Sequence, residues 1–575
     1  MKKYLFILSA AALLFSSCDL DEESKVEVPM KFVDNVEKAE LVLLGVYQSM
    51  TSQYVYGYHL SMLFTLGTDQ AQVEGNTTSS PREIPTNFHN ASTKEIAQTW
   101  NTLYNAVYNA NSCIETLERS MTGWSEGDKQ LATYYIAEAR ALRALYYFEL
   151  VRWFGNVALV TSTAESYKPI DYFEQVAPEK IYAFIEEDLK YAADVLPWAD
   201  DDHVRSSNDF RMSKGGALGL LAKVYCTWAG YPVKDETKWA EAAKTAKIVV
   251  ESGHHGLLPN FRTLWENSGA SVWDSTESLV EVSFYWNSKT GSSDPVGMIG
   301  KWNGVATSQA GNRGTCQARW RVVYPFVQKW ANALPDDPRR TLSVADYCYG
   351  FKGEVKVNGV NYTVIDTDGK QSYMEWLETA ADFTQSMTGK RPEVTDQKKD
   401  EQRIKFTPAK WDIEEYSKSS PLYSQNYNST VNWYVLRYAD LLLLYAEALN
   451  ESQGPTETAH AALNLVSRRA FGGSSKYDLS NLSQDGLRAA IRNERSYELC
   501  FEGHRKCDLI RWGIYYSTIR QTAQDVVDWS TTSKSSYLIY DYTREGRNEL
   551  MPIPQTQLDI MPKFKQNPGW GFLID

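Results

Sequence analysis

An apolar stripe with helical period runs through residues 128–154 and constrains the fold more than any other feature of the chain. Its members lie three or four residues apart, and Gly155 follows the last of them. A stripe of about seven turns predicts one long amphipathic helix, ended by a glycine cap, that must bury one face against other helices. The residues of the stripe are Leu131, Tyr135, Ala139, Leu142, Tyr146, Leu150 and Trp153.

Two further stretches each predict a pair of antiparallel helices. Residues 213–229 and 235–252 flank a Gly230-Tyr231-Pro232 break, and Gly454-Pro455 divides residues 437–470. Alanines at three- and four-residue spacing let the two helices of a pair approach closely. This plan is tetratricopeptide-like, although the copies diverge from a regular repeat. Other candidate helices are 37–51, 95–119, 178–196 and 484–512.

Residues 256–430 have a different character, because they are rich in Gly, Ser, Asn and Thr and hold eight of the 18 tryptophans. Their pattern predicts one helix near 321–332 and short strands such as Leu279 to Trp286 and Gly353 to Ile365. We therefore expect a mostly α fold. It combines a tetratricopeptide-like helix-pair scaffold with a large, irregular, loop-rich insertion that contains a few short strands, and long loops on a rigid scaffold commonly carry binding surfaces.

The first residues have the layout of an export signal. Lys2 and Lys3 precede an apolar stretch, Tyr4 to Phe15, that is too short to span a bilayer. It ends at Ser16-Ser17-Cys18, and small residues before a cysteine at this point are typical of a bacterial lipoprotein signal. This pattern predicts cleavage before Cys18 and acylation of its thiol, which would hold the protein on a membrane. An ordinary secretory signal with an incidental cysteine is the alternative.

These features divide the chain into six expected segments. They are a signal peptide (1–17), an acidic tether (18–36), an N-terminal helical scaffold (37–255), an aromatic-rich insertion that forms the ligand-binding lobe (256–430), a C-terminal scaffold (431–515) and a C-terminal segment packed on the scaffold (516–575).

Composition argues against several classes of partner and cofactor. The net charge of −13 disfavours nucleic acid, because an acidic chain repels phosphate. Six cysteines remain after Cys18, and their positions within helical patterns predict free, mostly buried thiols. Zinc-type spacings of cysteine and histidine are absent from the sequence. We therefore expect no metal and no cofactor.

Catalysis has weak support in the sequence. Glu494 and Glu498 are one helical turn apart, and paired carboxylates can hydrolyse glycosides. Arg492 and Arg495 lie on the same stretch, however, so ion pairs along a helix explain the carboxylates better. The sequence also lacks Gly-x-Ser-x-Gly, phosphate-loop and HExxH motifs. We therefore assign no catalytic residue.

The aromatic residues of the insertion are better candidates for function. The C–H face of a sugar stacks on tryptophan or tyrosine, while amide and guanidinium groups donate to sugar hydroxyls. For any single tryptophan, burial in the core is the alternative. The candidate rings are Trp302, Trp320, Tyr285 and Trp286, with Asn312 and Arg313 as donors.

Several sequence blocks resemble the SusD-like (SusD/RagB) family of Bacteroidota outer-membrane lipoproteins. They cover the helical framework and the C-terminus in family order, and the acidic run after Cys18 resembles the surface-export signal of such lipoproteins. The blocks are AEARALRALYYFELVRWFG (137–155), RYADLLLLYAEA (437–448), IRNERSYELCFEGHR (491–505), DLIRWG (508–513), MPIP (551–554) and QNPGW (566–570).

The resemblance implies a lipid-anchored protein on the cell surface at the outer membrane. Such a protein captures oligosaccharides and delivers them to a SusC-like TonB-dependent transporter, without catalysis and without a cofactor. A peptide-capturing member of the same family and an all-helical glycoside hydrolase are the alternatives.

The resemblance also directs attention to two regions. Family ligand sites draw on the loop near 66–99 and on the insertion. Because this loop contains no tryptophan, we expect Trp302 and Trp320 to supply the stacking rings, with Asp69 as a polar contact. Asn567-Pro568-Gly569 and the Arg/Glu-rich helix are expected to be scaffold.

Overall fold

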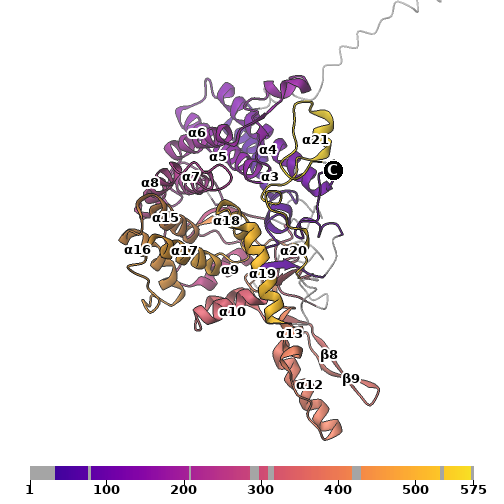
Figure 1. Cartoon of the computed structure of the whole chain (residues 1–575). Coiled ribbons are helices and arrows are strands. Elements are labelled where there is room, and N and C mark those ends of the chain that lie inside the picture. The colour runs from indigo at the N-terminus through magenta and orange to yellow at the C-terminus, as the bar shows by residue number, and fades with distance from the viewer. Residues whose placement is uncertain are drawn as a thin grey trace, which may run out of the picture.

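The computed structural model describes residues 33–75, 79–205, 209–284, 297–307, 316–416, 429–530 and 537–571. Figure 1 shows a helical body from which one smaller arm projects. Tyr285, Trp286, Asn312, Arg313 and Cys18 lie outside the described residues.

The body is a curved layer of helices in which each helix packs against the next. The insertion separates α8 from α15 along the chain, yet these two helices pack together and continue the layer. The mostly α prediction is therefore confirmed. In order, the helices are α3 (Val36–Thr51), α4 (Lys94–Ser120), α5 (Glu126–Phe154), α6 (Pro178–Val195), α7 (Lys214–Ala229), α8 (Lys238–Val250), α15 (Tyr438–Gln453), α16 (Glu457–Ala470) and α17 (Gln484–Glu498).

Helix α5 is the predicted long helix, and its ends follow from local chemistry. At its start, the Ser125 side chain accepts a hydrogen bond from the Asp128 N–H at 3.2 Å, which is an N-cap. At its end, Gly155 has φ +68°, a region that side-chain-bearing residues avoid. Both faces of α5 are buried over its second half, because α4 and α6 pack against it.

The insertion contains more helix than the sequence predicts. The expected helix is α10 (Tyr324–Ala333), but α9 (Phe261–Ala270), α12 (Tyr373–Thr388) and α13 (Asp396–Arg403) are additional. Helix α12 buries only Tyr373 and Ala381, so its apolar face is too narrow to stand out as a periodic pattern. Ser372 caps its start, and Gly389, at φ +74°, follows its end.

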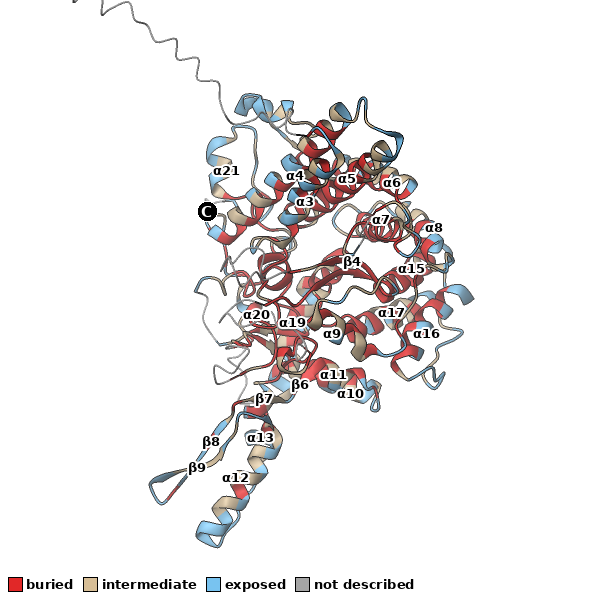
Figure 2. Ribbon diagram, turned by 180° about the vertical axis from the view of Figure 1, so that it is seen from behind, coloured by how far each residue is buried: buried red, intermediate tan, exposed pale blue. Residues whose placement is uncertain are grey.

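The segment expected as a strand from Gly353 to Ile365 is a hairpin. Strand β8 (Lys352–Val357) pairs antiparallel with β9 (Val360–Asp366). Asn358 and Gly359 connect them with φ values of +50° and +87°, and an Asn-Gly pair with positive φ at both positions is a favoured two-residue hairpin turn. The hairpin and α12 together form the arm (residues 352–388), which is mostly exposed or half-buried in Figure 2.

The strands in the described residues form two-stranded sheets, and three of these sheets, β1–β5, β4–β12 and β6–β11, join distant parts of the chain. Strand β4 (Ser278–Val282) pairs with β12 (Trp433–Arg437), and all residues of both strands are buried. This pair returns the chain from the insertion directly into α15. Shorter strands include β5 (Trp320–Val322), β6 (Val344–Ala345), β7 (Tyr347–Tyr349), β10 (Lys370–Ser372) and β11 (Thr407–Pro408), with the short helix α11 (Arg339–Ser343) before β6.

Six cysteines lie in the described residues, and all are free thiols, five of them buried, as the sequence predicts. Among the helices that the structure describes, none combines the length and the apolar character that a membrane crossing requires.

Candidate functional site

The two regions to which the sequence directs attention meet in the structure. Strand β1 (Ala71–Val73), from the loop near 66–99, pairs antiparallel with β5 of the insertion. Val73 lies opposite Trp320 and Ala71 opposite Val322. The pairing joins segments about 250 residues apart and holds the loop against the insertion.

A partly exposed group of charges, which we call the Glu74 surface, sits at the end of this strand pair. The carboxylate of Glu74 accepts hydrogen bonds from Arg319 at 2.5 Å and from Arg321 at 2.8 Å, and Arg82 lies 3.8 Å away. Side-chain exposure is 33% for Glu74 and 32% for Arg319, so water reaches both. One carboxylate cannot satisfy three guanidinium groups, and the remaining N–H donors can bind hydroxyls.

Sequence reasoning missed the Glu74 surface. Its only sequence signal is the alternation Arg319-Trp320-Arg321, in which successive side chains of a strand point to opposite faces. Two charged residues flanking one apolar residue indicate a strand with one wet and one dry face. The acidic partner, Glu74, lies far away in sequence and gives no such signal.

The structure places Trp302 and Trp320 inside the protein. Trp320 is 2% exposed and points to the buried face of β5, while Trp302 is 5% exposed. The Trp302 ring packs edge-on against Tyr58, with centroids 4.9 Å apart. Neither ring offers an open face on which a sugar can stack, so their contribution to the surface is support from beneath.

Asp69 is held by an arginine. Its two carboxylate oxygens accept hydrogen bonds from Arg505 at 2.9 and 2.7 Å, a bidentate pair. The side chain of Asp69 is 18% exposed. Because both oxygens are already bonded, the carboxylate acts first as the partner of Arg505.

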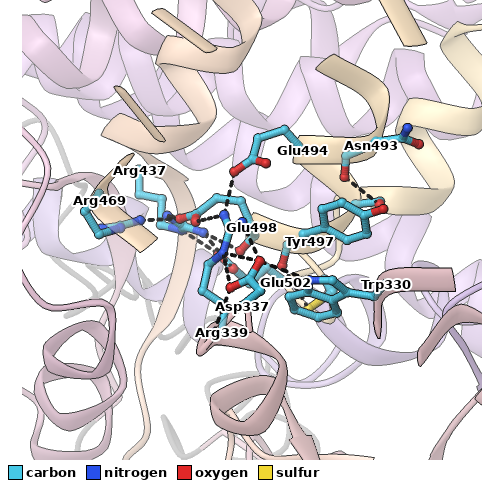
Figure 3. Close-up of polar contacts among 12 residues, drawn as sticks. Trp330, Asp337, Arg339, Arg437, Arg469, Asn493, Glu494, Tyr497, Glu498 and Glu502 are labelled. Carbon is cyan, nitrogen blue, oxygen red and sulfur yellow. Dashed lines mark hydrogen bonds and ion pairs between the residues drawn. The ribbon is translucent and has the colours of Figure 1, made fainter. Parts of the chain in front are cut away.

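The carboxylates of α17 form a buried ion network (Figure 3). Glu498 accepts from Arg437 at 2.6 Å and from Arg339 at 2.9 Å, and it also pairs with Arg469. Burial alone raises the pKa of Glu498, but the three guanidinium groups outweigh burial and hold the pKa well below its usual range. Ion pairs do explain these carboxylates, but the pairing along one helix that the sequence suggests is wrong. The partners lie on β12, α16 and α11, and Arg495 binds Asp440 and Asp508 instead.

Glu494, one turn earlier, accepts from Arg339 at 2.5 Å. Burial raises the pKa of Glu494, although Arg339 opposes this shift. Its side chain is only 8% exposed and that of Glu498 is 0% exposed, so neither carboxylate faces a substrate-sized opening.

The C-terminal motif is scaffold in the structure, as expected. The Asn567 side-chain amide donates to the carbonyl oxygens of Phe154 and Met551, both at 2.8 Å. These bonds fasten the C-terminal segment to the end of α5. In the part of the chain that the structure describes, no cluster of three or more His, Cys, Asp or Glu side chains can hold a metal ion.

Comparison with known proteins identifies the family. The model of the SusD family matches residues 323–570, and a second model, described as starch-binding associating with outer membrane, matches residues 19–226. A crystal structure of a SusD homolog from Bacteroides thetaiotaomicron VPI-5482 is 48% identical, covers 96% of this chain and 100% of its own, and superposes with a TM-score of 0.85.

More distant relatives match over most of the chain. SusD-like protein P2 of Formosa agariphila is 25% identical over 522 residues, which is 89% of this chain and 91% of that protein. Surface glycan-binding protein A from Bacteroides thetaiotaomicron, in complex with laminarihexaose, is 18% identical over 92% of this chain and 99% of its own, with a TM-score of 0.66. Together, the matched models, the 48% identity and the shared fold show that this chain belongs to the SusD family, and the description of the second matched model supports a location at the outer membrane.

Proposed function

We propose that this protein binds oligosaccharides on the cell surface and delivers them to a SusC-like TonB-dependent transporter of the outer membrane. The observation that carries the proposal is the 48% identity to a SusD homolog across nearly the whole chain. A member of the same fold that holds laminarihexaose supports a glycan as the ligand. Acylated Cys18 is the proposed anchor, and the acidic segment 18–36 is the proposed tether.

The proposed binding surface is the Glu74 surface together with the neighbouring segments of the insertion. Arg319 and Arg321 supply donors to sugar hydroxyls, and Glu74 keeps both guanidinium groups in place. Trp302 and Trp320 support this surface from below. Tyr285 and Trp286, with the donors Asn312 and Arg313, retain their proposed role as direct sugar contacts.

Binding without catalysis is part of the proposal. The carboxylate pair that the sequence offered for glycoside hydrolysis, Glu494 and Glu498, is instead bound in ion pairs with buried arginines. A protein held next to its transporter also needs only modest affinity, since tethering raises the effective concentration of its cargo.

Calorimetric titration of residues 19–575 tests the proposal. We expect heat of binding with a neutral hexasaccharide, laminarihexaose or maltohexaose, and no release of reducing ends on long incubation. Heat only with oligopeptides would instead support the peptide-capturing alternative, and released reducing ends would support a hydrolase.

A variant pair locates the surface. Arg319→Ala is expected to weaken hexasaccharide binding about ten-fold, because hydrogen bonds to charged groups are among the stronger polar contacts. Arg119→Ala, an exposed arginine at the end of α4, is the matched control and should bind as the parent does. Equal affinities for both variants would remove the Glu74 surface from the proposal. Recovery of a TonB-dependent transporter with the tagged protein from outer membranes tests the partner.

A further inference from the structure

A hollow lies where the arm joins the body. Its volume is about 570 Å³, within the usual range of about 300–1,000 Å³ for small-molecule sites. One wall comes from the arm and its base, with Lys370 on β10 and Glu375 on α12. The other wall comes from the body, with Arg340 on α11 and Asp346 and Tyr347 at β7. No residue of the Glu74 surface lines this hollow.

The hollow is preformed by hydrogen bonds at the base of the arm. Strand β10 pairs with β7, so that Ser372 lies opposite Tyr347. The Tyr373 N–H donates to the Asp346 carbonyl oxygen at 2.9 Å. The Tyr347 hydroxyl donates to the buried carboxylate of Asp412 at 2.7 Å, which fixes the orientation of the ring. These contacts hold both walls in register without a ligand.

The charged groups around the hollow do not form ion pairs with one another. Asp346 and Glu375 are exposed, and within the described ranges neither carboxylate makes an ion pair. The Lys370 ammonium lies 3.6 Å from the centre of the Tyr347 ring. The Arg340 guanidinium donates to the carbonyl oxygens of Pro335 at 3.0 Å and Leu334 at 3.4 Å, and among the described residues it makes no ion pair.

The balance of these charges indicates the class of ligand. Two carboxylates and two cations sum to zero, so the rim neither attracts nor repels a net charge strongly. It offers both acceptors and donors beside the apolar lining residues Val327, Val344 and Phe406. A neutral sugar presents hydroxyls that donate and accept together with an apolar C–H face, and so matches all three features.

We propose that the hollow at the base of the arm is a second oligosaccharide subsite, selective for neutral sugars over acidic ones. The inference rests on the proposed function, because it assigns the hollow a ligand of the same class. A subsite lined by none of the residues of the Glu74 surface lets one chain hold two segments of a polysaccharide, which raises avidity without tighter contacts at either place.

Chemical footprinting of Lys370 tests this subsite locally. Residues 19–575 are acetylated with and without saturating laminarihexaose or maltohexaose, and labelling at each lysine is measured by mass spectrometry. We expect the sugar to slow labelling of Lys370 several-fold and to leave Lys352, an exposed lysine on the same arm, unchanged. The variant Asp346→Asn/Glu375→Gln should need about ten-fold more sugar for the same protection. Glu354→Gln, which changes an exposed carboxylate on β8, is the matched control. In this variant the sugar should protect Lys370 from acetylation as well as it does in the parent.

Each other result overturns a stated part of the proposal. Calorimetric binding without protection of Lys370 would remove the subsite and leave the proposed function standing. Neither heat nor protection would contradict both. Stronger protection by an oligogalacturonate than by the neutral sugars would overturn the neutral class.

Discussion

The guanidinium of Arg437 and the carboxylate of Glu498 contact each other at 2.6 Å, and both side chains are fully buried. Arg437 is the last residue of β12 and Glu498 the last of α17, so the contact joins the strand that leaves the insertion to the helical scaffold. Glu277 and Glu502 also bind Arg437, at 3.0 and 2.7 Å. Charges buried this deeply are tolerated only because each is matched.

Removing the charge of Glu498 is expected to destabilise the fold strongly. Glu498→Gln leaves Arg437, Arg469 and Arg339 without their shared partner, and breaking a buried ion pair costs about 3–5 kcal/mol. Chemical denaturation of the parent and the variant measures the loss. Glu187→Gln, at an exposed position of α6, is the matched control and should stay within about 0.5 kcal/mol. A loss for Glu498→Gln as small as that of the control would show that the network does not stabilise the fold.

The helical framework could be predicted because its signal is local and long. The stripe of α5 extends over many turns, and the glycine breaks mark the ends of the helix pairs. Helix α12 was not predicted, because a helix that packs on one two-stranded hairpin needs only a narrow apolar face. The strand expected from Gly353 to Ile365 was divided by Asn358-Gly359, a turn signal that outweighs continuous β propensity.

The candidate site was harder to predict because it depends on pairing across the chain. No local pattern shows that β1 meets β5, or that Glu74 binds Arg319 and Arg321. Tryptophan adds a second ambiguity, since the same side chain serves as a stacking ring or as core. The alternation around Trp320 favoured the core, because its charged neighbours occupy the wet face of the strand.

Trp320 offers a direct test of its buried position. Trp320→Ala should lower the free energy of unfolding by about 3–5 kcal/mol, because it leaves a cavity beneath β5. Tyr167→Ala, which removes a ring that is 81% exposed, should change stability by no more than about 0.5 kcal/mol. Thermal and urea unfolding compare the two. An unchanged melting temperature combined with weaker sugar binding would return Trp320 to the role of a stacking ring.

The anchor gives a prediction that depends on sequence alone. Cys18→Ala removes the thiol that would carry the acyl chains, so the protein should move from the membrane fraction to the periplasmic fraction. Asp21→Asn, in the acidic run after the cysteine, leaves the thiol in place and should remain in the membrane fraction. Immunoblots of fractionated cells measure both. Membrane retention of Cys18→Ala would show that something other than lipid holds the protein.

Glu281 makes the stability of the fold depend on pH. It lies on β4, fully buried, and accepts hydrogen bonds from the Ser278 hydroxyl at 2.6 Å and from the Asn432 amide at 2.8 Å. Burial raises the pKa of Glu281 to about 7, and the two hydrogen bonds only partly oppose it. The side chain is therefore neutral in the folded protein under mildly acidic conditions, whereas an unfolded glutamate ionises near a pKa of about 4.3.

The sign of the effect follows from which state releases the proton first. Between about pH 4.5 and 7 the unfolded chain loses the Glu281 proton and the folded chain keeps it, so the free energy of unfolding falls as pH rises, by about 3 kcal/mol over that window. Glu281→Gln keeps a neutral side chain at every pH. Its free energy of unfolding should therefore rise steadily relative to that of the parent from pH 5 to pH 7, and the difference between the two should be constant above pH 8. Glu187→Gln, exposed on α6, should keep the slope of the parent. Urea midpoints at each pH measure the three curves, and parallel curves for Glu281→Gln and the parent would mean that Glu281 is already ionised in the folded protein.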